Sequence, residues 1–272
     1  MDDIAYTADC TSEHTVRRLR TNNWTTTLAQ LAEEVPVAFE YNGVSHAVMM
    51  ATPADLEEFA LGFSVSEGVV PSASEIYDID TGHGEDGITL RIRLSNAAFS
   101  MLKERRRTLA GRTGCGLCGT ESLAQVLRPM PSISDAPHLP PAGIRRALAG
   151  LKASQPLHNA TGGMHAAAWC TSQGELVKVM EDVGRHNALD KLIGAMILSE
   201  ADVQDGFALI TSRASVEMVQ KAATARMPAL VAVSAPTALA VRVAQQCGLT
   251  LIAFARGDEC VCYANAQHIA PE

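Results

Sequence analysis

The chain has 272 residues, of which 47% are apolar, so it can bury a core large enough for one large domain or two ordinary ones. Its formal net charge of -8 argues against broad binding to nucleic acid or to an anionic membrane surface, because both need clustered positive charge. No apolar run reaches the roughly 18 residues of a membrane-spanning helix, and the start MDDIAYTADC lacks a secretory signal pattern. We therefore expect a cytoplasmic protein with neither a membrane nor a nucleic-acid partner.

The first part of the chain predicts a small β-rich α+β domain. Its first roughly 30 residues lack clear periodicity, so we expect a weakly specified arm there, with no more than a short strand. Asn42-Gly43 favours a tight turn and predicts a hairpin between residues 35–39 and 44–50. A helix is expected from Thr52-Pro53, with the proline in its first turn. A strand over 88–94 and a helix over 96–109 follow.

Residues 111–119 read Gly-Arg-Thr-Gly-Cys-Gly-Leu-Cys-Gly, and so many glycines predict a loop around Cys115 and Cys118. Arginines at 105–107 and 112 lie upstream of the two cysteines, and cations lower the pKa of a nearby thiol. In a reducing compartment such a pair is metal-binding or catalytic more often than structural. Three chemistries stay open on these residues alone: a zinc site completed by distant cysteines or histidines, a dithiol redox centre, and persulfide carriage.

Five prolines between 129 and 142 predict a linker between a domain at 1–128 and a second domain at 143–272. In the second domain short apolar runs alternate with helical patterns, which indicates an α/β fold with a mostly parallel sheet covered on both faces. The expected strands span 166–170, 176–180, 207–211, 229–234 and 249–255. The expected helices span 186–198, 215–226 and 237–247.

Polar residues follow several of these strands, where open α/β sheets bind their ligands. Asp182, Arg185 and His186 follow one strand, Arg213 follows the next, and Ser234 and Thr237 follow another. We expect these turns to line one crevice with Arg213 as its charged anchor. The simpler alternative is that Asp182, Ser215 and Thr237 only cap helices and that His186 is an ordinary hydrogen-bonded histidine.

Six blocks of the sequence resemble the FdhD family of formate dehydrogenase accessory sulfurtransferases. They lie in order along the chain at 111–119, 161–165, 181–191, 211–221, 234–237 and 254–258. The resemblance implies that a cysteine desulfurase passes sulfur to Cys115, with Cys118 accepting or resolving it. It also implies a C-terminal domain similar to cytidine deaminases, a formate dehydrogenase as partner, and a homodimer.

The resemblance further implies that the sulfur acceptor is a molybdenum or tungsten bis-pterin guanine dinucleotide cofactor, which a guanine nucleotide could mimic. The chain itself would bind no metal tightly. A cofactor segment would be formed by Phe254, Ala255, Arg256, Gly257, Asp258 and Glu259. From the strand-end pattern we expect Asp182, Arg185, His186 and Arg213 to contribute to cofactor binding as well. Glu259 departs from the family pattern, in which a basic residue is common. A cofactor chaperone without thiol chemistry and a zinc-dependent deaminase are the rival functions.

Overall fold

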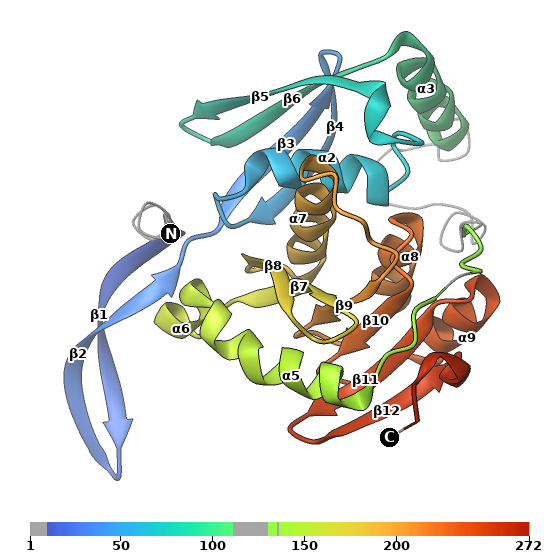
Figure 1. Cartoon of the computed structure of the whole chain (residues 1–272). Coiled ribbons are helices and arrows are strands. Elements are labelled where there is room, and N and C mark those ends of the chain that lie inside the picture. Colours follow the sequence, from blue (N-terminus) through green and yellow to red (C-terminus); the bar gives the residue numbers. More distant parts are fainter. Residues whose placement is uncertain (1–9, 111–129, 135, 272) are drawn as a thin grey trace.

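The computed structural model describes residues 10–110, 130–134 and 136–271. Over these ranges the chain forms three sheets, of two, four and six strands (Figure 1). None of the helices in the described ranges is long and apolar enough to cross a membrane.

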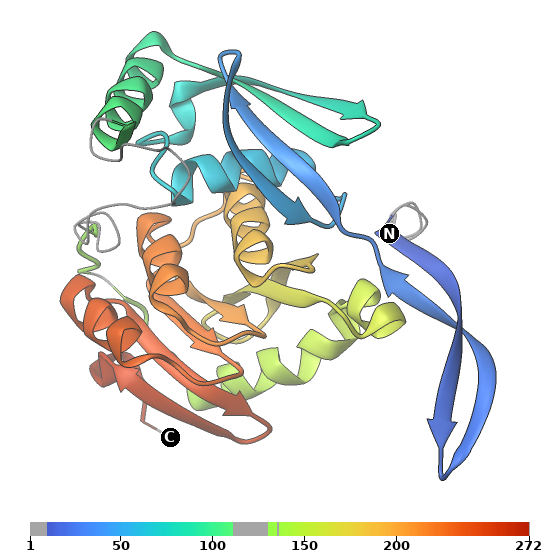
Figure 2. The ribbon, with the colours of Figure 1, turned by 180° about the vertical axis from the view of Figure 1, so that it is seen from behind.

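The N-terminal arm is a regular hairpin, and the expectation of a weakly specified arm is wrong. Strands β1 (Thr11–Arg20) and β2 (Asn23–Ala32) pair antiparallel along their whole length. Thr21 and Asn22 both have positive φ angles, as a tight hairpin turn requires. The sequence lacked an alternating pattern because both faces of the hairpin are largely exposed. The arm projects away from the rest of the molecule (Figures 1 and 2).

The four-stranded sheet has the order β4-β3-β6-β5 and includes the expected hairpin. Asn42 and Gly43 form its turn with positive φ angles. The edge strand β5 was not expected from the sequence, because its acidic and glycine-rich residues do not alternate with apolar ones. The inner face of the sheet packs against helices α2 and α3. The bounds are β3 (Val35–Tyr41), β4 (Val44–Ala51), β5 (Ile76–Gly84), β6 (Gly87–Leu94), α2 (Leu56–Ser66), α3 (Asn96–Ala110) and the 3-10 turn η1 (Ala73–Glu75).

Helix α2 begins later than the sequence predicts, and Pro53 is not in its first turn. The residue before the helix is Asp55, which has a positive φ angle of 51°. The helix begins later because residues from the second half of the chain hydrogen-bond to the backbone of Thr52. Its amide donates to Asp182 Oδ2 at 3.0 Å, and its carbonyl accepts from Lys191 Nζ at 3.0 Å.

The six-stranded sheet has the order β12-β11-β10-β9-β7-β8 and is mixed, so the expectation of a mostly parallel sheet is wrong. Only β9, β10 and β11 pair in parallel, whereas β7 runs antiparallel to both of its neighbours and β12 runs antiparallel to β11. Short apolar runs do not encode strand direction, which explains the error. The bounds are β7 (His165–Thr171), β8 (Leu176–Asp182), β9 (Gly206–Ile210), β10 (Ala229–Ala232), β11 (Thr250–Arg256) and β12 (Glu259–Ala264).

Helices cover both faces of this sheet, as expected. Alternate residues of β7 point to opposite cores: Trp169 packs with α7, α8 and α9, and Cys170 packs with α5. The described part of the proline-rich segment contacts the end of α9, since the Ile133 amide donates to the Cys247 carbonyl at 2.8 Å. The domain boundaries stay a prediction. The bounds are α5 (Pro141–Leu151), α6 (Pro156–Thr161), α7 (Arg185–Leu198), α8 (Val216–Thr224), α9 (Ala238–Cys247), η2 (Lys152–Ser154) and η3 (Ala266–His268).

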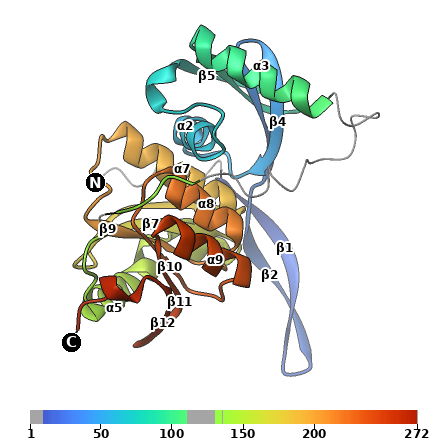
Figure 3. The ribbon, with the colours of Figure 1, turned by 90° about the vertical axis from the view of Figure 1, so that its right-hand side faces the viewer.

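Helix α2 lies between the four-stranded sheet and α7 (Figure 3). The two helices touch through glycines. A Cβ atom on Gly62 would lie 1.7 Å from the backbone oxygen of Asp190, and one on Gly194 would lie 1.9 Å from that of Glu58. Because neither glycine position has room for a side chain, the backbones of α2 and α7 are in direct contact. This contact holds α2 against the helices that cover the six-stranded sheet.

Candidate functional site

Four strands of the six-stranded sheet end at one edge. Strands β8, β9, β10 and β11 run in the same direction, since β8 and β9 are both antiparallel to β7. Their carboxyl ends therefore meet at the edge where β7 begins. We call this the strand-end edge and define it by His165, Asp182, Thr211, Ser234 and Phe254.

Hydrogen bonds link neighbouring members of the strand-end edge. The His165 ring lies 3.3 Å from Thr211 Oγ1, and His165 pairs with Asp182 in the β7–β8 register. The Phe254 amide donates to the Ser234 carbonyl at 3.2 Å. The sequence prediction that these separate turns share one edge is therefore correct, even though the sheet is mixed.

Arg185 and His186 open helix α7 at this edge. Arg185 Nε and His186 Nε2 are buried atoms that have no hydrogen-bond partner within the described residues. Burial lowers the pKa of His186 to about 4, and the nearby Arg185 and Lys221 cations act in the same direction. His186 is therefore a neutral imidazole at pH 7. Because buried polar groups usually have partners, these two atoms lack the hydrogen bonds that a protein interior normally supplies.

His165 has the same electrostatic character. Burial lowers its pKa, and the Arg185 cation adds to the effect. The edge thus combines two neutral histidines with the permanent charge of Arg185. The Arg185 cation attracts an anionic ligand, whereas a neutral histidine can only donate a hydrogen bond to it.

Asp182 is placed differently from the other predicted site residues. Its side chain is fully buried and pairs with the equally buried Lys191 at 2.7 Å. Its oxygens also accept hydrogen bonds from the amides of Thr52 and Gly184 and from the side chain of Asn187. These protein donors occupy the carboxylate, so it joins β4, β8 and α7 and presents no free oxygen to a ligand.

A second buried ion cluster, which sequence reasoning missed, lies beneath His186. Lys221 Nζ lies 2.8 Å from Asp190 Oδ1 and 2.6 Å from Glu67 Oε1, and it also donates to Ser66 Oγ. Burial lowers the pKa of Lys221, but the neighbouring carboxylates outweigh burial and raise it overall, so the ammonium stays charged. Nothing local in the sequence pairs Glu67 with Lys221, because α2 and α8 meet only in the fold.

Three further residues of the strand-end turns are Thr237, Ser215 and Arg213. Thr237 caps α9, since its side chain accepts from the Ala240 amide at 3.2 Å. Ser215 precedes α8 but makes no such capping bond. Arg213 is exposed just after β9. Its role as a charged anchor at the edge stays a prediction.

The predicted cofactor segment forms the far end of the strand-end edge. Arg256 pairs with Glu259 across a tight turn made by Gly257 and Asp258. Ala255 is buried, whereas Phe254 has a positive φ of 51° and exposes 43% of its surface. Arg256 Nε donates to the Val233 carbonyl at 3.0 Å, which ties the segment to β10.

Phe254 borders a cavity of about 400 Å³ at this end of the edge. Its ring lies 6.4 Å from that of Tyr263. The lining residues are Ala235, Pro236, Thr237, Ala238, Val241, Phe254 and Tyr263. An apolar cavity with two aromatic rings suits the planar face of a base. Four strand spacings separate β11 from β8, about 19 Å, so an elongated ligand is needed to reach both Phe254 and Arg185.

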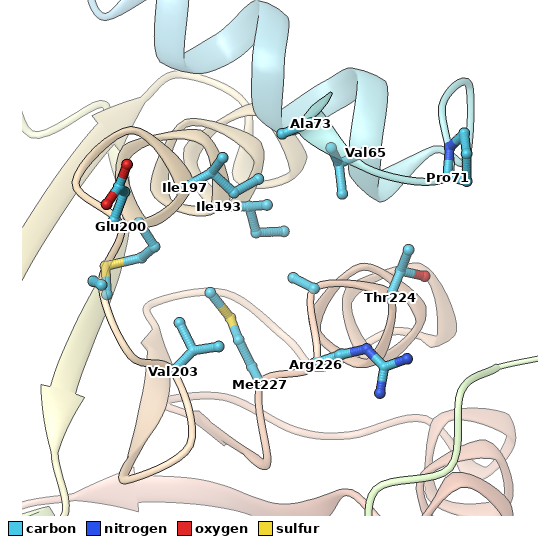
Figure 4. Close-up of a pocket in the computed structure, with 13 residues that line it drawn as sticks. Val65, Pro71, Ala73, Ile193, Ile197, Glu200, Val203, Thr224, Arg226 and Met227 are labelled. Atoms are coloured by element: carbon cyan, nitrogen blue, oxygen red, sulfur yellow. The ribbon is translucent and has the colours of Figure 1, made fainter. Parts of the chain in front are cut away.

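A second cavity, of about 430 Å³, lies away from the strand-end edge (Figure 4). It is formed by the C-terminal parts of α2, α7 and α8 and by the segments that follow them, with Val65, Ile193, Ile197 and Met227 among its lining residues. Its walls are mostly apolar and come from both cores. Because the helix N-termini and the two histidines lie elsewhere, we do not assign the site to it.

The described cysteines are poor nucleophiles. Burial raises the pKa of Cys170 to about 12 and also raises the pKa of Cys247. Partial desolvation raises the pKa values of Cys262 and of Cys260, which lies at the surface. Cys10 is buried. Thiols with raised pKa values form little thiolate at neutral pH. Cys115 and Cys118 lie outside the described residues. Within the described ranges, no group of three or more potential ligands from His, Cys, Asp and Glu could hold a metal ion.

Comparisons with known proteins agree on the relationship. A sequence model of the FdhD/NarQ family matches residues 32–270. Two curated relatives named sulfur carrier protein FdhD come from Cupriavidus necator and Xanthomonas campestris pv. campestris strain B100. The first is 55% identical over 89% of this chain and 84% of its own length, and the second is 50% identical over 94% and 91%.

The fold is also shared with a solved structure. A crystal structure described as that of a candidate formate dehydrogenase accessory protein from Desulfotalea psychrophila covers 96% of this chain and all of its own, with a TM-score of 0.75 and 24% identity. This likeness supports the mixed α/β architecture, while the similarity to cytidine deaminases stays a prediction. With the family match over most of its length and relatives at about half identity, the chain belongs to the FdhD/NarQ family.

Proposed function

We propose that this chain is a sulfurtransferase that carries persulfide sulfur for the maturation of formate dehydrogenase. The observation that carries the proposal is the match to named sulfur carriers at 55% identity over 89% of the chain. The raised pKa values of four described thiols support assigning the chemistry to Cys115 and Cys118 instead. The proposal requires a cysteine desulfurase as donor and a formate dehydrogenase as client, and it implies a cytoplasmic location.

The first step loads the carrier. The Cys115 thiolate attacks the terminal sulfur of the desulfurase persulfide, which forms a Cys115 persulfide and releases the desulfurase thiolate. In the second step Cys118 attacks the inner sulfur of that persulfide. A Cys115–Cys118 disulfide forms, and sulfide leaves for the metal of the acceptor. The two thiols supply both electrons, and a cellular dithiol reductant then restores them.

The acceptor is a molybdenum or tungsten bis-pterin guanine dinucleotide bound along the strand-end edge. The Phe254 and Tyr263 rings would hold its guanine end in the apolar cavity. Arg213, Arg185 and His186 would contact its phosphates, since Arg213 is exposed and Arg185 Nε and His186 Nε2 have no hydrogen-bond partner within the described residues. Asp182 acts indirectly, because Lys191 and three further donors hold it in place.

Mass spectrometry tests the carrier step. After incubation with a cysteine desulfurase and cysteine, the chain should gain one sulfur atom that a reductant removes. Cys115→Ala should abolish the gain, whereas Cys260→Ala, at an exposed thiol, should leave it unchanged. Loading that survives Cys115→Ala would reject the assignment. A chain that binds nucleotide but never gains sulfur would be a cofactor chaperone, and stoichiometric zinc would favour a metal site.

Nucleotide binding tests the acceptor site separately. GDP serves as the probe for the guanine end of the cofactor. Arg213→Ala should weaken GDP binding about tenfold, the size expected for loss of one charge-assisted hydrogen bond. Arg226→Ala removes an exposed arginine near the far end of α8 and is the matched control. Equal binding by both variants would contradict the proposed site.

A further inference from the structure

His165 is a half-buried histidine at the start of β7, and the strand order places it between two arginines. In the order β9-β7-β8, β7 lies between the strand that Arg213 follows and the strand that Arg185 follows. The Arg185 cation also contributes to the lowered pKa of His165, so these two side chains lie close together. An anionic ligand that reaches from one arginine to the other therefore passes over His165.

The hydroxyl group of Thr211 holds the His165 ring. Thr211 Oγ1 lies 3.3 Å from His165 Nδ1 and accepts a hydrogen bond from the Ala166 amide at 2.9 Å. Its proton has two acceptors within reach, which are His165 Nδ1 and the Ala166 carbonyl at 3.4 Å. That carbonyl already accepts from the Thr211 amide at 3.0 Å. The hydroxyl therefore donates to His165 Nδ1, which is closer and has no other partner within the described residues.

This hydrogen bond sets the tautomer of His165. Burial and the Arg185 cation lower the pKa of His165, so its ring is neutral at pH 7 and carries one proton. A ring nitrogen that accepts a hydrogen bond leaves that proton on the other nitrogen. With Nδ1 as the acceptor, Nε2 carries the proton and is the donor.

The Nε2 donor of His165 has no protein acceptor. No residue in the described part of the chain hydrogen-bonds to it, and unlike His186 Nε2 it is not a buried atom. It is therefore open to a ligand at the strand-end edge. A phosphate oxygen suits this position, because a hydrogen bond to a charged acceptor is stronger than one to a neutral acceptor and the nearby Arg185 cation favours an anion.

We propose that Thr211 is a positioning residue that holds His165 in its Nε2–H form, and that His165 Nε2 donates to a phosphate oxygen of a nucleoside diphosphate group between Arg213 and Arg185. This contact rests on the proposed acceptor site, to which it adds one binding residue and the residue that orients it. The alternative is that the Thr211 hydroxyl only ties β7 to β9.

NMR of the whole chain with isotope-labelled histidine tests the tautomer, and His165→Asn identifies the resonances of His165. The wild type should have a protonated Nε2 and an unprotonated Nδ1 at His165. Thr211→Val should mix the two tautomers, whereas Thr211→Ser, which keeps the hydroxyl, should not. Addition of GDP should shift the Nε2 resonance of His165 and leave that of the exposed His83 unchanged. A proton on Nδ1, or an Nε2 resonance that bound GDP does not shift, would overturn the proposal.

The affinity for GDP tests the contact itself. His165→Asn has no donor at the Nε2 position and should weaken GDP binding about tenfold, as for loss of one hydrogen bond to a charged group. His165→Gln brings an amide nitrogen close to the Nε2 position and should recover most of this loss. His83→Asn is the matched control and should bind GDP as the wild type does. Far-UV circular dichroism and thermal unfolding verify that each variant is folded.

The outcomes separate the role of His165 from the acceptor site as a whole. Full GDP affinity in His165→Asn, with weakened binding in Arg213→Ala, would overturn only the role of His165. A wild-type chain that does not bind GDP would overturn both. Equal losses in His165→Gln and His165→Asn would leave His165 a structural residue and reject the contact. A less stable Thr211→Val that keeps both the Nε2–H form and the GDP affinity would reject the positioning role of Thr211.

Discussion

The Lys191–Asp182 pair gives the sharpest test of how the two parts of the chain are joined. Both side chains are fully buried, 2.7 Å apart, and Lys191 also donates to the Thr52 carbonyl. Lys191→Met keeps the length of the side chain and removes its charge. The Asp182 carboxylate would then stay buried without a cation. Breaking a buried pair from one side costs about 3–5 kcal/mol.

Three remaining donors limit this loss. The amides of Thr52 and Gly184 and the side chain of Asn187 still hydrogen-bond to Asp182 in the variant. We therefore expect the lower end of the range, a decrease of about 3 kcal/mol in the free energy of unfolding. That is a large share of the roughly 5–15 kcal/mol that stabilises a typical protein.

Urea unfolding followed by circular dichroism measures the change. Lys178→Met, at an exposed lysine on β8, is the control and should change stability by less than about 0.5 kcal/mol. Adding Asp182→Asn to Lys191→Met removes the uncompensated charge and should recover part of the loss. A loss below about 1 kcal/mol for Lys191→Met alone would refute the view that this ion pair fastens β4 to α7.

Two further predictions follow from the same junction. Gly62→Ala should destabilise the protein by about 1–3 kcal/mol, because its Cβ would meet the Asp190 backbone. Gly163→Ala should be nearly neutral in the same urea assay, because its Cβ would make only ordinary contacts at 3.9 Å. His186 has a pKa of about 4 in the folded chain against 6.5 unfolded, so the unfolded chain binds the extra proton. Stability should therefore fall as pH drops from 6.5 towards 4, and His186→Asn should reduce that slope. A slope unchanged by His186→Asn would contradict the buried neutral imidazole.

Local sequence patterns predicted much of the secondary structure. Asn42-Gly43 predicted its hairpin because two residues suffice to define a turn. The strands and helices after residue 160 matched their apolar periodicity within a few residues, because each buries its own side chains in a period that the sequence displays. The β1–β2 arm and β5 escaped prediction because neither has the apolar alternation of a half-buried strand.

The strand-end edge was predictable in part. The turns after consecutive strands pointed to Arg185, His186 and Arg213, since strand ends can be located without knowing the sheet order. The same reasoning gave Asp182 a ligand role, although Lys191 and three other donors enclose it. A carboxylate at a strand end looks the same in the sequence whether its partner is a ligand or a buried lysine.

The sequence by itself determined the family, the position of most elements and the cysteine pair within residues 111–119, because these depend on residues close together in the chain. Only the tertiary structure decided the strand directions and the buried ion pairs. Thr52 and Asp182 are 130 residues apart, and Lys221 and Ser66 are 155 apart, yet they hydrogen-bond. Such partners are selected by how α2 packs on α7 and α8, and that packing is a property of the whole core rather than of any local pattern.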